Sequence, residues 1–555
     1  MKMKLLLYLS IGVGLLSACD DAFLDQYPKD QLSESNFWQT PKDAEMFVND
    51  MYTILPGDMI GSDTRSDNAV YGIKWAEEDI AKGIYDPLDG TFSGHWSYQY
   101  GRIRKVNVYF ENVEKIPDLD PAQKKRLDAQ AKFFRAWSYF ELAKVFAGVP
   151  IVLKSLTVDE TYDVERASLK EVIELIQKDL TEAAADLPES WPGEYGKITK
   201  GTALAFKARV ELFFINNNDA GLDNALAQAA EQDAKAVIDL GIYHLFKEDV
   251  NGDGEINDID YKALFNTSYP GDPQKAEMIL ETQFVKDLRG NGYNTWNAPP
   301  PMGWGGINPT QSFVDEFETI NGLTISEDPA YDDAHPFDNR DPRLEVCVWH
   351  HGEDFVWLND TLTMKTRPVP EDAPMGIGTH GDATSTGYYQ QKFFQADEDM
   401  RDGAKDSWNS PYDWPVIRYA EVLLTYAEAR VWQDKIDDET YSAIDEVRTR
   451  VGMPPVDRAK YASKDDMIKL LIRENRAEFG MEGKRWLDVR HYGIDVDVLV
   501  GQYYGMKYDP ATQTAFVGEP IPSGVPRIYS SHNRLWPIPQ DERTLNPKLE
   551  QNPGY

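Results

Sequence analysis

Cysteine is nearly absent from this chain of 555 residues, which contains only Cys19 and Cys347. If the Cys19 thiol carries a lipid, as argued below, Cys347 has no partner for an intrachain disulfide, although disulfides are common in exported proteins. Cys347 lies in the apolar segment 344–349, whose pattern is typical of a strand. We therefore predict a buried, unreactive thiol and not a nucleophile.

Basic side chains are also scarce. The chain has 57 Lys and Arg against 93 Asp and Glu, and its formal net charge is −36 at pH 7. Such a field repels nucleic acid and anionic lipid, so we expect no nucleic-acid partner. It also disfavours heavily sulfated or uronate-rich ligands, and it favours neutral ligands and bound cations.

Long hydrophobic runs are missing except at the N-terminus. Residues 5–16 follow Lys2 and Lys4 and are apolar, but they are fewer than the roughly 20 residues of a membrane-spanning helix. With the small residues before Cys19, they predict a signal peptide over residues 1–18. The segment resembles a bacterial lipobox, in which the cysteine is acylated and becomes the mature N-terminus. The alternative is an ordinary signal peptide with a chance cysteine. We expect Cys19 to tether the protein to a membrane surface by lipid.

Apolar residues at helical spacing predict an all-α fold of stacked helical hairpins, similar to tetratricopeptide repeats. The segment 245–410 is different, because it is rich in Gly, Pro, Asp and aromatic residues and has few helical stripes. Such a segment predicts a large, mostly irregular insertion lobe. The expected organisation is a signal peptide (1–18), a tether with a first helix and loops (19–95), a helical scaffold (96–244), the insertion lobe (245–410), and C-terminal helices with a closing segment (411–555). Helices are expected over residues 41–52, 96–110, 121–147, 168–187, 199–215, 224–240, 418–432, 439–451 and 465–481.

Residues 249–260 follow the pattern of a twelve-residue calcium loop. Gly254 occupies the position of the sharp turn, and Asp260 replaces the usual final Glu, with a shorter side chain. The alternative is an acidic Asn-Gly turn. We predict a structural Ca²⁺ that rigidifies the entry to the insertion lobe, and its ligands would be Asp249, Asn251, Asp253, Glu255, Asn257 and Asp260. The motifs of phosphate loops, dinucleotide sites and Gly-x-Ser-x-Gly elbows are absent, and the pair His350-His351 lacks the spacing of a zinc site.

Aromatic side chains gather in the loop 291–306, where Gly, Pro and Asn predominate. Tyr293, Trp296 and Trp304 cannot all be buried cheaply in such a loop. A sugar ring presents an apolar C–H face that lies flat on an aromatic ring, while amides bind its hydroxyls. We therefore predict glycan contacts from these three rings, with Asn294 as a hydrogen-bonding neighbour.

Several short segments, spread over nearly the whole mature chain, occur together in one known family. They are residues 134–142 (FRAWSYFEL), 308–317 (NPTQSFVDEF), 339–344 (NRDPRL), 417–424 (IRYAEVLL), 473–479 (RENRAEF), 535–539 (LWPIP) and 551–555 (QNPGY). By these segments the chain resembles the SusD/RagB family of Bacteroidetes outer-membrane lipoproteins. The charged residues of segment 473–479 have spacings that allow ion pairs, so we predict a structural role for them and not a catalytic one.

The resemblance implies a non-enzymatic protein on the outer face of the outer membrane. It implies capture of oligosaccharides for a SusC-like TonB-dependent transporter. Family binding sites also draw on the loops before the first long helix, which adds four candidates for the glycan site: Asp67, Tyr71, Trp75 and Trp96. Core packing is the competing interpretation for Trp96, because it also begins a helical stripe.

Three other functions stay open at this point. One is capture of peptides or glycopeptides, as in some members of the family. Another is a glycoside hydrolase, which needs two carboxylates about 5 to 9.5 Å apart. The last is a structural scaffold for the transporter.

Overall fold

The computed structural model describes residues 37–56, 63–72, 79–216, 223–250, 252, 258–265, 276–401, 403–509, 515–520 and 526–555. Several predicted residues lie outside these ranges, so the structure does not test their roles. They are the lipidation residue Cys19, the aromatic Trp75, and the calcium-loop residues Asn251, Asp253, Glu255 and Asn257.

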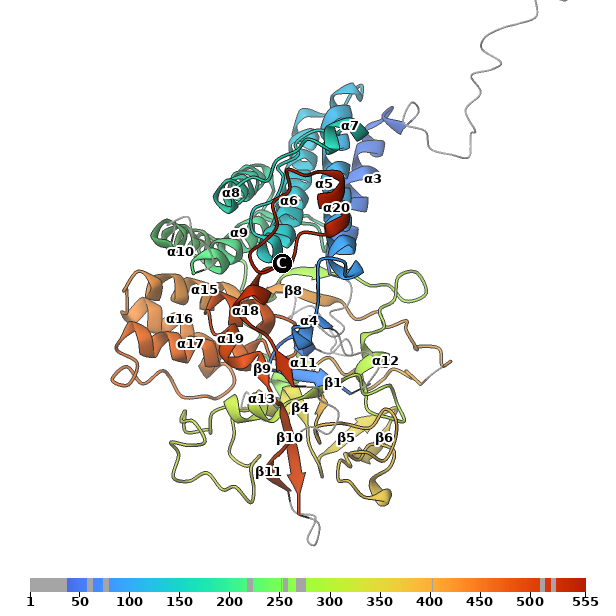
Figure 1. Ribbon diagram of the computed structural model, residues 1–555. Coiled ribbons are helices and arrows are strands. Elements are labelled where there is room, and N and C mark those ends of the chain that lie inside the picture. The colour runs from blue at the N-terminus through green and yellow to red at the C-terminus, as the bar shows by residue number, and fades with distance from the viewer. Residues whose placement is uncertain are drawn as a thin grey trace, which may run out of the picture.

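Antiparallel helices form the upper part of the molecule, and α15 to α17 continue this arrangement beside them (Figure 1). The predicted all-α, tetratricopeptide-like architecture is confirmed. The long helices are α3 (Pro41–Met51), α5 (Gly90–Asn112), α6 (Pro121–Phe146), α8 (Leu169–Asp186), α9 (Lys200–Phe214), α10 (Asp223–Asp239), α15 (Tyr419–Trp432), α16 (Asp438–Thr449) and α17 (Lys464–Glu478).

Local sequence explains where these helices begin. Asp120 caps α6 by accepting a hydrogen bond from the backbone N–H of Gln123 at 2.8 Å, and Pro121 occupies the first turn. Ser168 and Glu171 form a capping box at the start of α8. Large rings then lock the hairpins together, since Trp137 of α6 stacks on Phe206 of α9 at 4.6 Å between ring centroids.

Short elements make up most of the insertion lobe and the closing segment. The short α-helices are α4 (Asp79–Lys82), α7 (Val158–Thr161), α11 (Asp258–Ala263), α12 (Tyr293–Asn297), α13 (Gln311–Glu316), α14 (Leu344–Cys347), α18 (Arg485–His491), α19 (Asp495–Val498) and α20 (Gln540–Leu545). Five 3-10 turns cover Tyr52–Ile54, Asp63–Arg65, Val113–Lys115, Pro370–Asp372 and Ser531–Arg534 within the described chain.

Strands occur only as antiparallel pairs in the described ranges. The pairs are β1 (Ala69–Tyr71) with β3 (Ile307–Pro309), β2 (Met278–Thr282) with β8 (Trp414–Arg418), β4 (Val348–Trp349) with β7 (Tyr389–Gln390), β5 (Asp354–Trp357) with β6 (Asp360–Thr363), β9 (Val500–Gly501) with β12 (Arg527–Ile528), and β10 (Tyr504–Tyr508) with β11 (Ala515–Pro520). The β1–β3 pair joins the segment before α5 to the aromatic loop, and β2–β8 joins the lobe to α15.

Three local predictions were wrong. Residues 57–95 are not all loop, because β1, α4 and the first turns of α5 fall there, and Asp89 caps α5 by accepting from the backbone N–H of Thr91. Residues 500–530, whose sequence is typical of loops, contain the β10–β11 hairpin. The segment around Cys347 begins as helix α14 and becomes strand only at Val348.

The thiol of Cys347 is fully buried, as predicted. Burial raises its pKa to about 12. At neutral pH it is therefore protonated and shielded, which makes it a poor nucleophile.

Ion pairs inside the protein join the segments that carry the family resemblance. Glu478 of α17 accepts hydrogen bonds from Arg418 at 2.9 Å and from Arg343 at 3.3 Å, and it also pairs with Arg450. Arg343 in turn pairs with Glu474, and all five side chains are buried. The charges of α17 thus bind other elements of the fold, which agrees with a structural role.

No helix in the described part of the chain is long and apolar enough to cross a membrane.

Candidate functional site

Three tryptophans from two separate segments meet at the surface of the insertion lobe, and one of them, Trp296, lies on α12. The ring centroids of Trp304 and Trp408 are 5.2 Å apart, and those of Trp296 and Trp304 are 5.8 Å apart. We call these three residues the tryptophan platform. Trp408 is 41% exposed, Trp304 is half-buried, and Trp296 is 8% exposed beneath them. Trp408 and part of Trp304 are therefore accessible to a ligand, and the buried indole of Trp296 supports them.

Backbone hydrogen bonds fold the loop that carries Trp304 back onto α12. The backbone N–H of Trp304 donates to the carbonyl of Thr295 at 3.0 Å, and that of Gly306 donates to the carbonyl of Trp296 at 2.8 Å. A β-carbon on Gly306 would overlap the indole of Trp296. Glycine is therefore required here for close approach, and it lets Trp296 lie flat under the loop.

Trp408 reaches the platform in an unfavourable backbone conformation. Its φ is +57°, in the left-handed region, which costs a bulky residue roughly 1–3 kcal/mol. Its backbone N–H donates to Oγ1 of Thr295 at 2.9 Å, and a β-carbon on Gly292 would overlap its ring. The fold thus bears a local strain to hold a large apolar ring at the surface, where burial does not compensate for it. Strain of this kind is typical of a functional position.

The sequence analysis missed Trp408. Trp408 lies in the segment Asp406-Ser407-Trp408-Asn409-Ser410. Like the aromatic loop 291–306, this segment places a large ring among polar residues. The sequence did not predict the contact because Trp408 follows Trp304 by more than 100 residues.

Apolar and polar groups adjoin the platform in the neighbouring turn 285–289. Val285 is 54% exposed and Leu288 is 84% exposed. Asn409, next to Trp408, donates through Nδ2 to Asp287 at 2.8 Å. This surface therefore combines flat apolar faces with amide and carboxylate groups, the combination that binds a sugar ring.

Three of the residues predicted to touch the ligand are instead buried, and the first of them is Trp296 of the platform, which is 8% exposed. Tyr293 is 4% exposed, and its ring packs 4.7 Å from that of Trp414. Asn294 is 5% exposed and donates to Oε2 of Glu398 at 2.9 Å. Both lie on α12 below the platform, so they support it and have no accessible face for a ligand.

The candidates from the first loops and helix are also buried. Trp96 packs against Tyr100 and Phe146 inside the helical scaffold, so the core interpretation holds for it. Tyr71 is 8% exposed in β1 and belongs to the same apolar cluster as Trp296.

Asp67 is 4% exposed and forms ion pairs with Arg485 at 2.8 Å and Arg476 at 3.0 Å. Burial by itself would raise its pKa, but the two guanidinium charges outweigh burial and hold the pKa well below its usual range. Asp67 therefore anchors the first loop to α17 and α18.

Two carboxylates near the platform are buried. Glu398 accepts from Asn294 and from Ser410, and burial raises its pKa. Asp406 pairs with Lys286, which outweighs the effect of burial and lowers the pKa of Asp406. Each is at most 6% exposed, so neither is placed to attack or protonate a ligand on the rings.

The two ends of the predicted calcium loop lie close together. Asp260 is 1% exposed and accepts from the backbone N–H of Val250 at 2.7 Å, and Asp249 accepts from that of Gly252 at 2.6 Å. The loop is thus closed at its base. The calcium site stays a prediction, because its middle ligands lie outside the described residues.

Comparisons with known proteins agree with this fold. A profile described as the SusD family matches residues 264–555, and one described as starch-binding associating with outer membrane matches residues 22–212. A SusD-like protein of Formosa agariphila is 25% identical over 98% of this chain and 97% of its own length.

Two solved structures from Bacteroides fragilis are also similar. A SusD-like protein has a TM-score of 0.79 and 25% identity, over 96% of this chain and 100% of that one. A SusD-like carbohydrate-binding protein has a TM-score of 0.77 and 25% identity, over 93% of this chain and 100% of that one. Since the first profile covers more than half of the sequence, the chain belongs to the SusD family.

Proposed function

We propose that this protein captures a neutral oligosaccharide on the tryptophan platform. The observation that carries the proposal is Trp408, an exposed indole held in a strained backbone conformation against Trp304. Buried side chains such as Phe393, with φ +73°, share this backbone conformation, so the exposure of the Trp408 ring is what distinguishes it from the core. Membership in the SusD family, and the likeness to a SusD-like carbohydrate-binding protein, support the same ligand class.

Charge supports a neutral ligand. The chain carries a net charge of −36, and a polyanionic glycan would approach against that field. Stacking on flat rings needs no charge on the sugar. Each ring contributes about 1 kcal/mol beyond the apolar area that it buries.

We also propose that the protein works at the cell surface. The lipobox-like segment before Cys19 supports a lipid anchor, and the profile described as associating with outer membrane supports the location. In this scheme the bound oligosaccharide passes to a SusC-like TonB-dependent transporter. Co-purification of the two proteins from solubilised outer membranes tests the partnership. Recovery of this lipoprotein without any transporter would contradict it.

The binding test compares variants of the platform. A ligand that covers roughly 50 Å² of the Trp408 ring gains about 1 kcal/mol from area and about 1 kcal/mol from stacking. Trp408→Ala should therefore weaken binding at least tenfold, and Trp304→Ala should do the same. Affinity electrophoresis in a panel of neutral and acidic polysaccharides, followed by calorimetry, measures the change.

Tyr162 supplies the matched control for that experiment. It is 42% exposed at the end of α7, in the helical scaffold, so Tyr162→Ala removes an equally exposed ring elsewhere. Binding should be unchanged in this variant. Equal affinity in wild type, Trp408→Ala and Trp304→Ala would refute the platform as the site.

Peptide capture is the second candidate, because a groove of about 750 Å³ lies beside α17 and α13. Arg473 and Glu316 line it, together with Tyr503 and the exposed Tyr504. The charges of Arg473 and Glu316 can bind the polar backbone and the termini of a peptide. Calorimetry with peptide mixtures, in the wild type and in Tyr504→Ala, distinguishes this groove from the platform. Incubation with glycans and product analysis tests for hydrolysis.

We propose that the predicted calcium ion stabilises the insertion lobe and does not contact the ligand. Its removal by a chelator should lower the melting temperature and leave glycan affinity nearly unchanged. The variant Asp253→Ala, which removes one oxygen ligand, should make the melting temperature much less sensitive to chelator. Identical melting curves with and without calcium would end this part of the proposal.

A further inference from the structure

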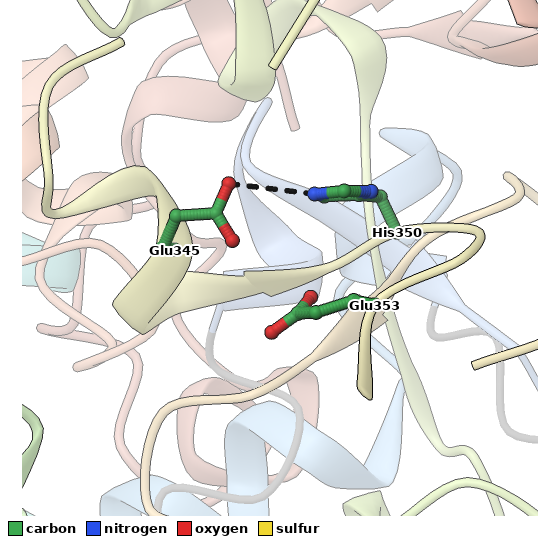
Figure 2. Close-up of side chains that lie close together, drawn as sticks. All are labelled: Glu345, His350 and Glu353. Atoms are coloured by element: carbon green, nitrogen blue, oxygen red, sulfur yellow. Dashed lines mark hydrogen bonds and ion pairs between the residues drawn. The ribbon is translucent and has the colours of Figure 1, made fainter. Parts of the chain in front are cut away.

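A histidine and two glutamates converge where α14 turns into β4 and then into β5. Glu345 lies on α14, His350 directly follows β4, and Glu353 directly precedes β5. One ligand atom from each lies within 4.8 Å of the others, and Nε2 of His350 is 3.4 Å from Oε1 of Glu345. Figure 2 shows the imidazole and both carboxylates directed toward one another.

The histidine is oriented for coordination through Nε2. Its Nδ1 lies 3.2 Å from the carbonyl oxygen of His351, which can only accept, so Nδ1 carries a proton. Nε2 then faces the carboxylates. The ring also stacks on Phe337, with 3.7 Å between centroids and 2° between planes, which fixes its orientation. A backbone carbonyl on Nδ1 is the usual outer contact of a metal-binding histidine.

One carboxylate oxygen of Glu353 accepts no hydrogen bond from the described residues and is therefore available to a ligand in the cluster. Its Oε1 accepts from Nε2 of Gln391 at 3.2 Å, while Oε2 is buried and has no hydrogen-bond partner in the described structure. A buried carboxylate beside a second carboxylate is stabilised by a bound cation.

From this geometry we infer that Glu345, His350 and Glu353 bind a divalent transition-metal ion of the zinc type. One nitrogen and two carboxylate ligands suit Zn²⁺, whereas Ca²⁺ takes oxygen ligands alone. At bond lengths near 2.1 Å, tetrahedral ligand atoms lie about 3.4 Å apart. The His350–Glu345 separation already matches this spacing, and Glu353 needs a shift of about 1 Å.

The position of the site implies a structural role within the lobe. β4 and β5 bring Trp349, Phe355 and Trp357 into one apolar cluster with Ala298 and Met302, which belong to the loop that carries Trp304. A metal ion between α14 and the turn 350–353 would tie this hairpin to the helix before it. The ion would thus brace the layer beneath the platform without touching its ligand.

The test uses the purified mature protein, stripped with chelator and then dialysed into buffer that contains CaCl₂. Titration with ZnCl₂ should reveal one bound ion per chain. His350→Gln, Glu345→Gln and Glu353→Gln should each weaken Zn²⁺ binding at least tenfold, and Zn²⁺ should raise the melting temperature of the wild type alone. The control is His335→Gln, which breaks an exposed pair between His335 and Asp332 that has no third ligand in the described structure.

X-ray absorption of the zinc-loaded wild type gives a second measurement that does not depend on the stability of any variant. We expect one imidazole nitrogen and oxygen atoms in the first coordination shell. The inference is overturned if no ion binds, if His350→Gln binds Zn²⁺ as tightly as wild type, or if the spectrum shows oxygen ligands only.

Discussion

Replacing Glu478 by Gln tests the ionic cluster that holds the lobe to the helices. The side chain is fully buried and accepts hydrogen bonds from Arg418, Arg343 and Tyr261. Gln keeps the shape but removes the charge, so the arginines lose their shared buried counter-ion. Removing one partner of a buried pair costs about 3–5 kcal/mol when the other charge is left alone. Arg418 keeps Glu277 and Glu482, and Arg343 keeps Asp341 and Glu474, so this figure is the upper bound for Glu478→Gln.

The pH dependence of stability has a definite sign. Burial alone would raise the pKa of Glu478, but the charges of Arg450, Arg418 and Arg343 outweigh it and hold that pKa well below its usual range. In the unfolded chain the carboxyl returns to an ordinary pKa near 4.3. The stabilising contribution is therefore complete above that value and is lost as the pH falls toward the folded-state pKa. Glu478→Gln should show a weaker acid dependence than the wild type.

Equilibrium urea unfolding, followed by tryptophan fluorescence at pH 7 and at pH values below about 4, measures both effects. The control is Glu446→Gln, since Glu446 is 40% exposed and lies 3.8 Å from Lys247. Exposed pairs contribute about 0–1 kcal/mol, so this variant should unfold like the wild type. A loss below 1 kcal/mol in Glu478→Gln would refute the argument that the cluster depends on this charge.

Three further predictions concern the platform, the thiol and the anchor. Gly292→Ala should displace the Trp408 ring and weaken glycan binding about as much as Trp408→Ala, whereas Gly94→Ala, with open space around it, should bind normally in calorimetry. Cys347 should resist iodoacetamide at pH 8 in the native protein and react in denaturant, as read by mass spectrometry; rapid native labelling would contradict its burial. Cys19→Ser should abolish incorporation of labelled palmitate and release the protein from membranes, and retained label would rule out the lipobox assignment.

Local patterns in the sequence predicted most of the scaffold. The helices α6, α8 and α17 begin within one residue of the expected positions, because Asp120, Ser168 and Ser463 cap them and a cap depends only on residues two or three apart. The division into a helical body and a loop-rich lobe also followed from composition. The boundary of α5 was misplaced, since its cap at Asp89 lies in a stretch without apolar periodicity.

The exposure of single side chains in the lobe could not be read from the sequence. Tyr293 and Trp304 occur in one loop of similar composition, yet the first is core and the second is at the surface. The difference arises because Trp414, more than 100 residues later, covers Tyr293, while Trp408 leaves one edge of Trp304 open.

The sequence by itself determined the helical scaffold, the buried thiol and the family segments, since these depend on spacing along the chain. Only the tertiary structure brought Trp408 to Trp304 and Trp296, and only it directed Glu345 and Glu353 toward His350. The physical reason is that both groupings depend on turns and strand pairs that join separate segments. Side-chain packing then decides which atoms reach solvent and which reach one another.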